Sequence, residues 1–246
     1  MAVTVAVVSY NTRELLLRCL RSLRGGDADV WVIDNASTDG SADAARELAP
    51  WATVLDAGAN LGFGGAVNAV AERTQSEWLL AANADIALES GALAAMLDAG
   101  RPERVGAVAP RLLLPDGSTQ HSVHPFPTVP LTLAFNLGLA RLWPALGDEL
   151  CLEGYWNPDR RRSVPWALGA CLLLRRAAFD DVGGFDPSQW MYAEDVDLCW
   201  RLADAAYAVR YEPNAHVRHE AGAATRTVFG ERPEPVFLTA TYAMLK

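Results

Sequence analysis

The sequence predicts an α/β fold in which a mostly parallel sheet is covered by helices on both faces. Short apolar runs alternate with amphipathic segments through the first half of the chain, which is the pattern of repeated strand–helix–strand units. The strand-like runs are almost wholly apolar, as expected of parallel strands that are buried on both faces. Polar, glycine-containing turns follow these runs, and open α/β sheets bind their ligands at that position.

The first half of the chain is expected to contain four strands separated by three helices. The strands are predicted at Val3–Val8, Val30–Ile33, Thr53–Leu55 and Trp78–Ala82. Thr12 is expected to cap the first helix. The apolar face of that helix carries Leu15, Leu16, Cys19, Leu20 and Leu23. The second helix begins at Ser41 and ends near Pro50, and the third runs from the Asn60–Gly65 segment through Ala71.

Beyond Val105 the alternation weakens. Pro115–Ser118 has the composition of a hairpin turn, whereas the segment 121–162 is rich in proline and tryptophan and has no clean period. A strand is expected over Val164–Leu174 and a helix over Glu194–Ala205. No repeat, low-complexity stretch or linker interrupts the chain, so residues 1–246 are expected to form a single domain.

The composition excludes several classes of protein. The net charge of −9 argues against nucleic-acid binding and against general adsorption to an anionic membrane. Hydrophobic residues make up 51% of the chain, which excludes a disordered protein. No signal peptide or membrane-spanning run is recognised, and the four cysteines, none in a C-x-x-C pair, are expected to be reduced core residues. These features favour a cytoplasmic protein.

An acid follows the last of the four predicted strands, in the segment Asn83-Ala84-Asp85. A carboxylate there is poorly placed for packing but well placed to bind a metal ion that bridges a diphosphate. Alternatively, Asp85 caps a helix that starts near Glu89. The residues alone leave both interpretations open.

Three acids crowd the first turn of the helix predicted from Glu194. They can complement the helix macrodipole, and Asp197 can pair with Arg201 four residues later. Neither role explains why Glu194 and Asp195 are adjacent just after an aromatic stretch. Repulsion between their carboxylates is expected to raise a pKa toward that of a working general base.

His216 and His219 follow a strand predicted at Ala208–Tyr211. The neighbouring residues favour an extended segment, where these two side chains face opposite sides, so at most one is expected to bind a metal. A separate cluster, Gly62, Gly64 and Gly65, is not the dinucleotide-binding fingerprint, because it does not follow the first strand. Close packing of a helix on the sheet explains these glycines equally well.

Six segments stand in a characteristic order along the chain. They are VVSYN from Val7, VIDNASTDGS from Val32, NLGFGGAVNA from Asn60, ANADI from Ala82, WALGACLLLRRAAFDDVGGFD from Trp166 and MYAEDVDLCWRL from Met191, with the His219 region after them. In this order they resemble glycosyltransferase family 2, and within it the rhamnosyltransferase-like branch. The resemblance covers about Val3–Gly222. It implies a GT-A fold, a Rossmann-like three-layer sandwich, and sugar transfer from a nucleoside-diphosphate donor with inversion at the anomeric carbon.

The resemblance also implies roles for single residues. Those expected in the donor pocket are Ser9, Tyr10, Asn11, Asp34, Asn35, Asn60, Gly62, Asn83 and Gly169, the last where the backbone must let the sugar approach. Asp85 matches the metal-binding acid of a D-x-D-like motif, and His219 matches a histidine that completes the site for magnesium or manganese. Asp195 resembles the catalytic base. Glu194 is then expected to bind acceptor hydroxyls or to position the loop from Gly183.

The implied partners are a nucleotide-sugar donor, with dTDP-rhamnose favoured, and a saccharide or lipid-linked acceptor. The nucleotide is expected to bind in the half of about 1–110 and the acceptor in the half of about 111–246, with at most a peripheral contact at the inner face of the cell membrane. The apolar segment Thr128–Gly147, with Arg160–Arg162 after it, is either ordinary core and a solvated loop or a lid over the acceptor lipid and its phosphates.

The chain departs from the family pattern at Asn83, which replaces the first acid of the motif, so Asp85 must provide most of the metal binding. Family members also usually carry further helices after the His219 region. One rival function is a sugar-nucleotide-forming nucleotidyltransferase, but Val7–Asn11 lacks the glycines and lysines expected for binding a triphosphate. The other is a catalytically degenerate binding module, against which the retained acids and His219 argue.

Overall fold

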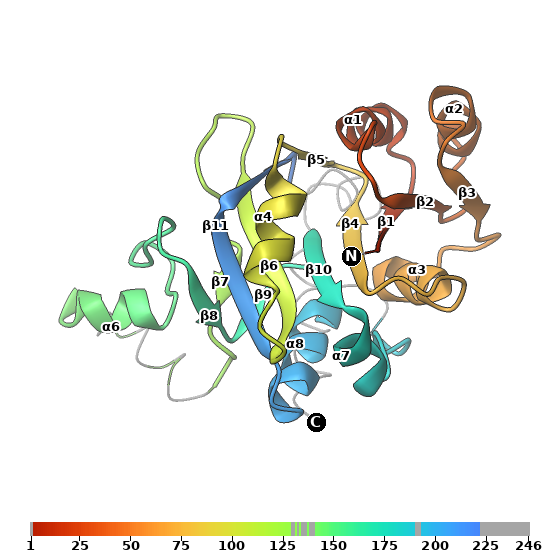
Figure 1. The fold of residues 1–246 in the computed structure, drawn as a ribbon. Helices are drawn as coiled ribbons and strands as arrows, with labels where there is room; N and C mark the ends of the chain where they lie inside the picture. Colours follow the sequence, from red (N-terminus) through yellow and green to blue (C-terminus); the bar gives the residue numbers. More distant parts are fainter. Residues whose placement is uncertain are drawn as a thin grey trace.

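The structure is a computed structural model that describes residues 2–128, 131, 133, 137, 141–189 and 193–221. Within these residues a nine-stranded sheet has the order β3-β2-β1-β4-β10-β6-β11-β5, with β8 beside β11 (Figure 1). Its strands are β1 Val3–Ser9, β2 Asp29–Asp34, β3 Thr53–Asp56, β4 Trp78–Asn83, β5 Ile86–Leu88, β6 Val105–Leu113, β8 Arg162–Val164, β10 Cys171–Arg175 and β11 Ala208–His219. A separate pair is formed by β7 Val123–His124 and β9 Trp166–Ala167.

The sheet is parallel in its first half and mixed in its second. Strands β3, β2, β1 and β4 are all parallel to one another. Strand β10 is antiparallel to β4 and β6, whereas β11 is parallel to β6 and antiparallel to β5 and β8. The predicted α/β class with a covered central sheet is therefore confirmed. The parallel part lies within the half of about 1–110 that was predicted to bind the nucleotide.

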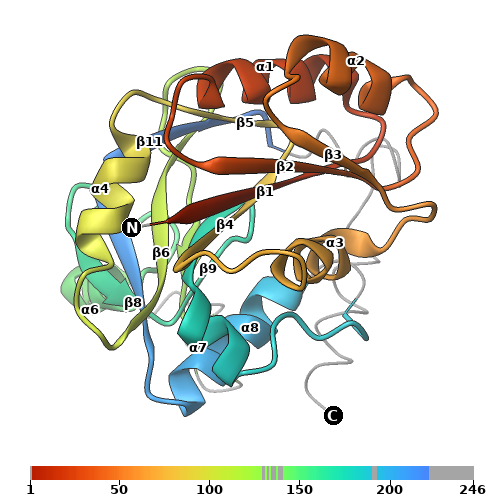
Figure 2. The same cartoon turned by 45° about the vertical axis from the view of Figure 1, so that its right-hand side comes forward.

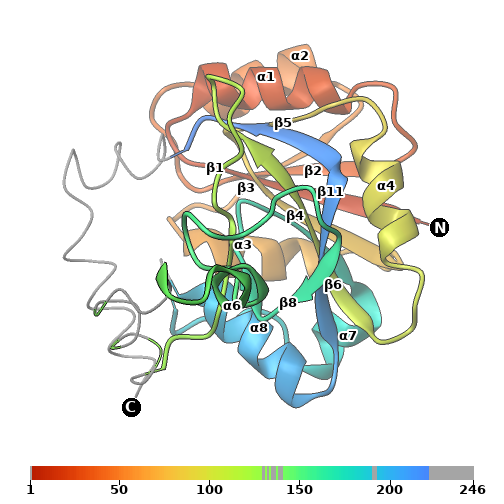
Figure 3. The ribbon, with the colours of Figure 1, turned by 90° about the vertical axis from the view of Figure 1, so that its left-hand side faces the viewer.

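Helices cover both faces of this sheet. The helices are α1 Arg13–Leu23, α2 Ser41–Leu48, α3 Gly62–Ala71, α4 Ala92–Ala99, α6 Pro144–Glu149, α7 Arg176–Asp181 and α8 Glu194–Asp204. Buried side chains of α1, α2 and α4 belong to one core cluster, and those of α3, α7 and α8 belong to a second. Figure 2 shows α1 and α2 above the sheet and α3, α7 and α8 below it, and Figure 3 shows the same layers from the side.

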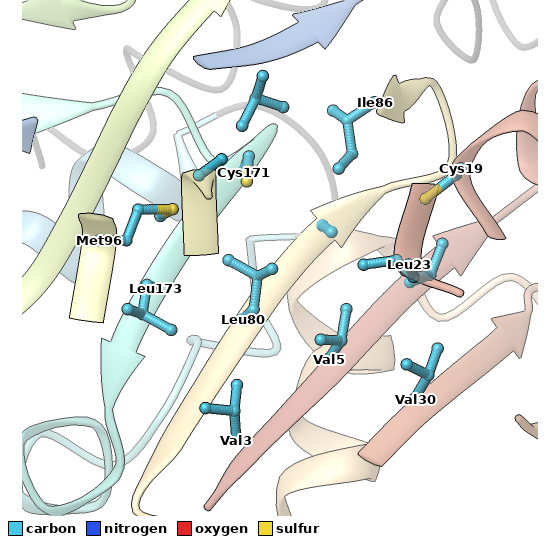
Figure 4. Packing of buried hydrophobic residues seen from close by; sticks show 14 of the residues in the cluster. Val3, Val5, Cys19, Leu23, Val30, Leu80, Ile86, Met96, Cys171 and Leu173 are labelled. Carbon is cyan, nitrogen blue, oxygen red and sulfur yellow. The ribbon is translucent and has the colours of Figure 1, made fainter. Parts of the chain in front are cut away.

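Strand β1 shows why both layers are needed. Val3, Val5 and Val7 point into the first core cluster, where Val5 lies near Leu23, Val30 and Leu80 in Figure 4. Ala6 points to the opposite face and packs in the second cluster. Because successive side chains of a strand alternate between faces, this wholly apolar strand can be buried only between two layers of helices.

Several predicted elements differ from the structure. The strand expected over Ala208–Tyr211 continues to His219 as β11. The strand expected over Val164–Leu174 is divided into β8, β9 and β10. Pro165 has no N–H to donate to a strand ladder, which accounts for the first break. Thr12 takes the N-cap position of α1, but its hydroxyl does not cap the helix and lies instead 3.2 Å from the Ser9 hydroxyl.

Two further expectations agree with the structure. Cys19, Cys151, Cys171 and Cys199 are buried and unpaired. The turn at Pro115–Ser118 closes a hairpin in which Leu113 bridges Thr119. Among the described residues, every helix is too short or too polar to cross a bilayer.

Candidate active site

The carboxyl ends of the parallel strands bring the predicted donor residues to one edge of the sheet. Ser9 ends β1 and is paired with Asp34 at the end of β2. On the other side of β1, Val8 is paired with Asn83 at the end of β4. The C-terminal edge of a parallel sheet is the usual ligand-binding position, so this row of polar side chains marks the candidate site.

The turns after β1 and β2 are locked together by Asn11. Its N–H donates to Ser37 Oγ at 2.9 Å, and its Oδ1 accepts from the N–H of Thr38 at 2.7 Å. Asn11 has a positive φ of 51°, a conformation that asparagine tolerates better than most residues. Asp34 Oδ2 accepts the N–H of Ser37 at 2.8 Å. Tyr10, partly buried, lies between Ser9 and Asn11 in the first of these turns.

A third turn joins this edge through Gly62. Asn35 Nδ2 donates to the Gly62 carbonyl at 3.1 Å, and the Gly62 N–H donates to Asn60 Oδ1 at 3.0 Å. Gly62 has a φ of +72°, which a side chain would disfavour. At position 64 a glycine is needed for lack of space, because a Cβ there would lie 2.7 Å from Phe185 Cβ. Gly64 thus allows α3 to pack closely against Phe185 of the loop between α7 and α8, not against a strand as predicted, whereas Gly62 shapes the site.

Two oxygens at this edge are buried without a partner. Asp34 Oδ1 and Asn35 Oδ1 have no hydrogen bond within the described part of the chain, although both residues are buried. A buried acceptor left unpaired costs about 1–3 kcal/mol. Such atoms are rare in folded proteins and call for a missing donor, which a bound molecule with N–H or O–H groups would supply.

Asp85 and His219 form a second polar group at the same edge. Asp85 does not cap a helix, because β5 follows it directly and α4 begins only at Ala92, after Gly91. The pairing of β5 with β11 sets Ile86 opposite His219. His219 Nε2 lies 3.4 Å from Asp85 Oδ1, and the two residues are 6% and 7% exposed. His216, on the same strand, pairs instead with Glu89, so only His219 reaches this group.

These residues suit a divalent cation bound jointly with a ligand. Asp85 Oδ1 is buried and has no hydrogen bond to the described residues. No cluster of three or more histidine, cysteine or acidic side chains that would hold a metal occurs in the described ranges. Within the described residues the protein therefore offers Asp85 and His219 as ligands here, and further ligands such as the oxygens of a bound diphosphate would have to complete the coordination.

Asp195 lies at the start of α8, next to the turn that precedes β10. Its Oδ2 accepts the N–H of Gly169 at 2.9 Å, and its Oδ1 accepts the N–H of Val196 at 2.8 Å. A Cβ on Gly169 would lie 3.3 Å from Asp195 Cβ. The carbonyl of Ala170, the residue after Gly169, accepts a hydrogen bond from the N–H of Asn83 at 2.9 Å. Asp195 is thus joined through Gly169 and Ala170 to the end of β4, two residues before Asp85.

The two adjacent acids have raised pKa values, as predicted, but the main cause differs. Burial raises the pKa of Glu194 to about 8, and the Asp195 carboxylate adds a smaller contribution. Burial likewise raises the pKa of Asp195, although its backbone hydrogen bonds act in the opposite direction. Glu194 Oε2 has no hydrogen-bond partner in the described structure. Glu194 is therefore available to a hydroxyl of a bound molecule.

The loop from Gly183 is held by residues other than Glu194. Arg201 Nη1 donates to the carbonyls of Val182 and Gly184, both at 2.7 Å. Asp197 pairs with Arg201 at 2.5 Å, as predicted, but the pair is partly buried and is not an exposed helix pair. Asn68 also holds this loop, through two hydrogen bonds with the backbone of Phe185.

The three arginines Arg160–Arg162 are already paired with carboxylates. Arg160 pairs with Asp148 and Glu149, Arg161 pairs with the buried Glu212, and Arg162 pairs with Asp148. These ion pairs favour the interpretation of Arg160–Arg162 as part of an ordinary solvated loop. They argue against the alternative in which the arginines bind the phosphates of an acceptor lipid. The apolar segment before them differs, because several of its side chains are more than half exposed: Leu133, Leu137, Leu142, Trp143 and Leu146.

One residue of the site gave no signal in the sequence. Gln120 Oε1 lies 2.7 Å from His219 Nδ1, although the two residues are 99 positions apart. Gln120 falls at the border of the segment without periodicity, so only the tertiary structure identifies it.

The family of the chain follows from its sequence. The family described as Glycosyl transferase family 2 matches residues 4–183, and Glycosyl transferase family group 2 matches residues 158–232. The chain belongs to glycosyl transferase family 2. It is therefore a glycosyltransferase, and the nucleotidyltransferase alternative is not supported.

Two curated relatives cover most of the chain. An N-acetylglucosaminyl-diphospho-decaprenol L-rhamnosyltransferase of Mycobacterium tuberculosis is 36% identical over 230 residues, 87% of this chain and 75% of that protein. Rhamnosyltransferase WbbL of Escherichia coli is 25% identical over 241 residues, 93% of this chain and 87% of that protein. The predicted rhamnosyltransferase-like branch of the family is thereby confirmed.

A solved structure shares the fold. The mannosyltransferase PcManGT from Pyrobaculum calidifontis, solved in complex with GDP-Man and Mn²⁺, superposes with a TM-score of 0.63 at 20% identity. The superposition covers 97% of this chain and 68% of that one. The predicted GT-A fold is confirmed by this likeness.

Proposed function

We propose that this enzyme transfers L-rhamnose from dTDP-rhamnose to a hydroxyl of a lipid-linked saccharide, with inversion at the anomeric carbon and with magnesium or manganese. The observation that carries the proposal is a set of buried oxygens at one end of the sheet that have no hydrogen-bond partner among the described residues: Asp34 Oδ1, Asn35 Oδ1, Asp85 Oδ1 and Glu194 Oε2. The curated rhamnosyltransferase that is 36% identical supports the choice of sugar and of a lipid diphosphate acceptor.

The donor nucleotide would bind on the turns after β1, β2 and β3. Asp34 Oδ1 and Asn35 Oδ1 are acceptors only, so they match the N–H of a pyrimidine base and the hydroxyls of a sugar ring. The hydrogen bonds of Asn11 and Gly62 hold these turns in one arrangement before the donor arrives. Because the turns are already ordered, less conformational entropy is lost when the donor binds.

The diphosphate would lie at Asp85 and His219, the two residues that would hold the cation. A bound divalent cation supplies positive charge that stabilises the departing nucleoside diphosphate. Asn83 contributes no charge at the neighbouring position, which leaves Asp85 as the anionic ligand. The Mn²⁺ in the mannosyltransferase complex of the same fold supports this assignment.

Asp195 would act as the general base. As the acceptor oxygen attacks the anomeric carbon, the bond from that carbon to the diphosphate oxygen breaks and its electron pair leaves with the diphosphate. The acceptor proton passes to the Asp195 carboxylate, which the Gly169 N–H holds in place. A single displacement of this kind inverts the anomeric centre and needs one carboxylate base.

The experiment that tests this function is a transfer assay read by product mass. The chain is incubated with Mg²⁺, a short-chain polyprenyl diphosphate that carries N-acetylglucosamine, and in turn dTDP-rhamnose, UDP-N-acetylglucosamine or GDP-mannose. We expect the acceptor to gain one deoxyhexose with dTDP-rhamnose only. Efficient transfer from GDP-mannose would contradict the choice of dTDP-rhamnose as the donor. If none of the three donors releases its nucleoside diphosphate, the proposed transferase activity is contradicted.

We also propose that the exposed apolar side chains between residues 133 and 146 contact the membrane that holds the acceptor lipid. Trp143 and Leu146 are 59% and 54% exposed, and leucine with tryptophan is typical of interfacial segments. The double change Trp143→Ser with Leu146→Ser should lower transfer to acceptor in vesicles about thirtyfold, because the two buried apolar groups contribute on the order of 1 kcal/mol each.

Transfer to a water-soluble, short-chain acceptor should stay unchanged in that double variant. Trp51→Ser is the matched control, because Trp51 is also exposed but lies beside α2 and β3. If the double variant transfers as fast as the wild type to the acceptor in vesicles, as well as to the water-soluble acceptor, the membrane contact is ruled out.

A further inference from the structure

Gln120 lies beside the proposed metal site, although no motif marks it. It follows the hairpin that leaves β6, and its N–H donates to the Leu112 carbonyl at 2.9 Å. Leu112 is paired in the sheet with Val217, two residues before His219. The hairpin therefore fixes Gln120 next to the strand that carries His219.

The carboxamide of Gln120 determines which nitrogen of His219 carries a proton. Its Oε1 lies 2.7 Å from His219 Nδ1, and an amide oxygen can only accept a hydrogen bond. Nδ1 must then carry the hydrogen, so Nε2 of the neutral ring has a free lone pair.

That lone pair faces another acceptor. His219 Nε2 lies 3.4 Å from Asp85 Oδ1, and this oxygen makes no hydrogen bond within the described part of the chain. Two buried acceptors that face each other are unfavourable unless a proton on Nε2 or a metal cation lies between them. Neighbouring ligands of an octahedral ion, each about 2.1 Å from it, are about 3 Å apart, which is close to the observed separation.

We propose that Gln120 is a positioning residue for the metal site. It holds His219 in the Nδ1–H form and so directs Nε2 toward the ion that Asp85 binds. Histidines that bind metals are commonly oriented by a hydrogen bond from their other nitrogen, and loss of that bond weakens metal affinity by about 10–100-fold. This inference rests on the proposed metal-dependent function.

The test compares Gln120→Leu, which removes the acceptor, with Gln120→Glu, which keeps an acceptor oxygen. Binding of Mn²⁺ to the full chain in the presence of dTDP is followed by electron paramagnetic resonance. Gln120→Leu should weaken the affinity about 10–100-fold, whereas Gln120→Glu should restore it to within about threefold of the wild type. Gln75→Leu, at an exposed glutamine, is the control and should bind like the wild type.

The second readout is the ¹⁵N NMR signature of the His219 ring in the metal-free chain. The wild type should show the Nδ1–H tautomer, and Gln120→Leu should lose that preference. Wild-type affinity in Gln120→Leu, equal losses in the Leu and Glu variants, or an Nε2–H ring in the wild type would each overturn the role of Gln120. A wild type that binds dTDP but no Mn²⁺ would overturn the metal site as well, and so separates the two failures.

Discussion

Asp195→Asn is expected to reduce turnover by a factor of about 10²–10⁴, with donor binding retained, because asparagine cannot accept the acceptor proton. The carboxylate accepts the N–H groups of Gly169 and Val196 on its two oxygens. An asparagine has one acceptor oxygen, so one of these N–H groups loses its partner. The variant therefore needs a check that it still folds and binds the donor, for which a thermal shift with dTDP and Mg²⁺ is suitable.

The pH dependence of turnover is an independent test of Asp195 as the general base. Burial raises the pKa of Asp195, and a general base works only when deprotonated. Turnover of the wild type should therefore fall as the pH decreases through this raised pKa, and the residual rate of Asp195→Asn should lose that limb. Rates are compared at saturating substrate.

Asp197→Asn is the matched control, two residues away on the same helix. Loss of its ion pair with Arg201 should cost about 1–2 kcal/mol of unfolding free energy, because the pair is only partly exposed. Turnover of the folded fraction should remain near that of the wild type. If Asp195→Asn keeps more than about a tenth of the wild-type turnover, a general base lies elsewhere and Glu194 is the next residue to replace.

The sequence predicted the sheet edge well because the end of each strand is a local property. Each apolar run ends where a polar turn begins, and parallel strands bring those turns together at one edge, as Ser9, Asp34 and Asn83 show. The assignment of Asp195 as the base followed from the family resemblance and stays a prediction. The hydrogen bond of Asp195 with Gly169, 26 residues earlier, is visible only in the structure.

The features that escaped prediction depend on contacts between distant segments. Gln120 meets His219 across 99 residues, and no periodicity or composition marks such a pair. The raised pKa of Glu194 was expected from repulsion, but burial, which depends on the packing of the whole domain, contributes more. The pair of Asp197 with Arg201 follows from their spacing, but its partial burial does not, because Arg201 also holds the loop at Gly183.

Asp85→Ala is expected to cause the second large loss, in affinity for the metal and nucleotide. Asp85 is the anionic member of a two-residue site, and its Oδ1 is buried without a hydrogen-bond partner among the described residues. Removing one of so few ligands should weaken the Mn²⁺–dTDP complex by more than about a hundredfold. The fold should change little, because the unpartnered oxygen contributes no hydrogen bond to it. Transfer should fall with metal occupancy.

The edge of the sheet formed by β1, β2 and β4 is the centre of the proposed function, and Mn²⁺ affinity in the presence of dTDP tests it most directly. The titration compares the wild type, Asp85→Ala and Asp56→Ala, whose exposed acid ends β3 at the same edge and pairs with Arg46. We expect the wild type and Asp56→Ala to bind alike and Asp85→Ala to lose more than about a hundredfold in affinity. Binding of Mn²⁺ and dTDP by Asp85→Ala as tight as that of the wild type would contradict the assignment of this edge as the donor and metal site.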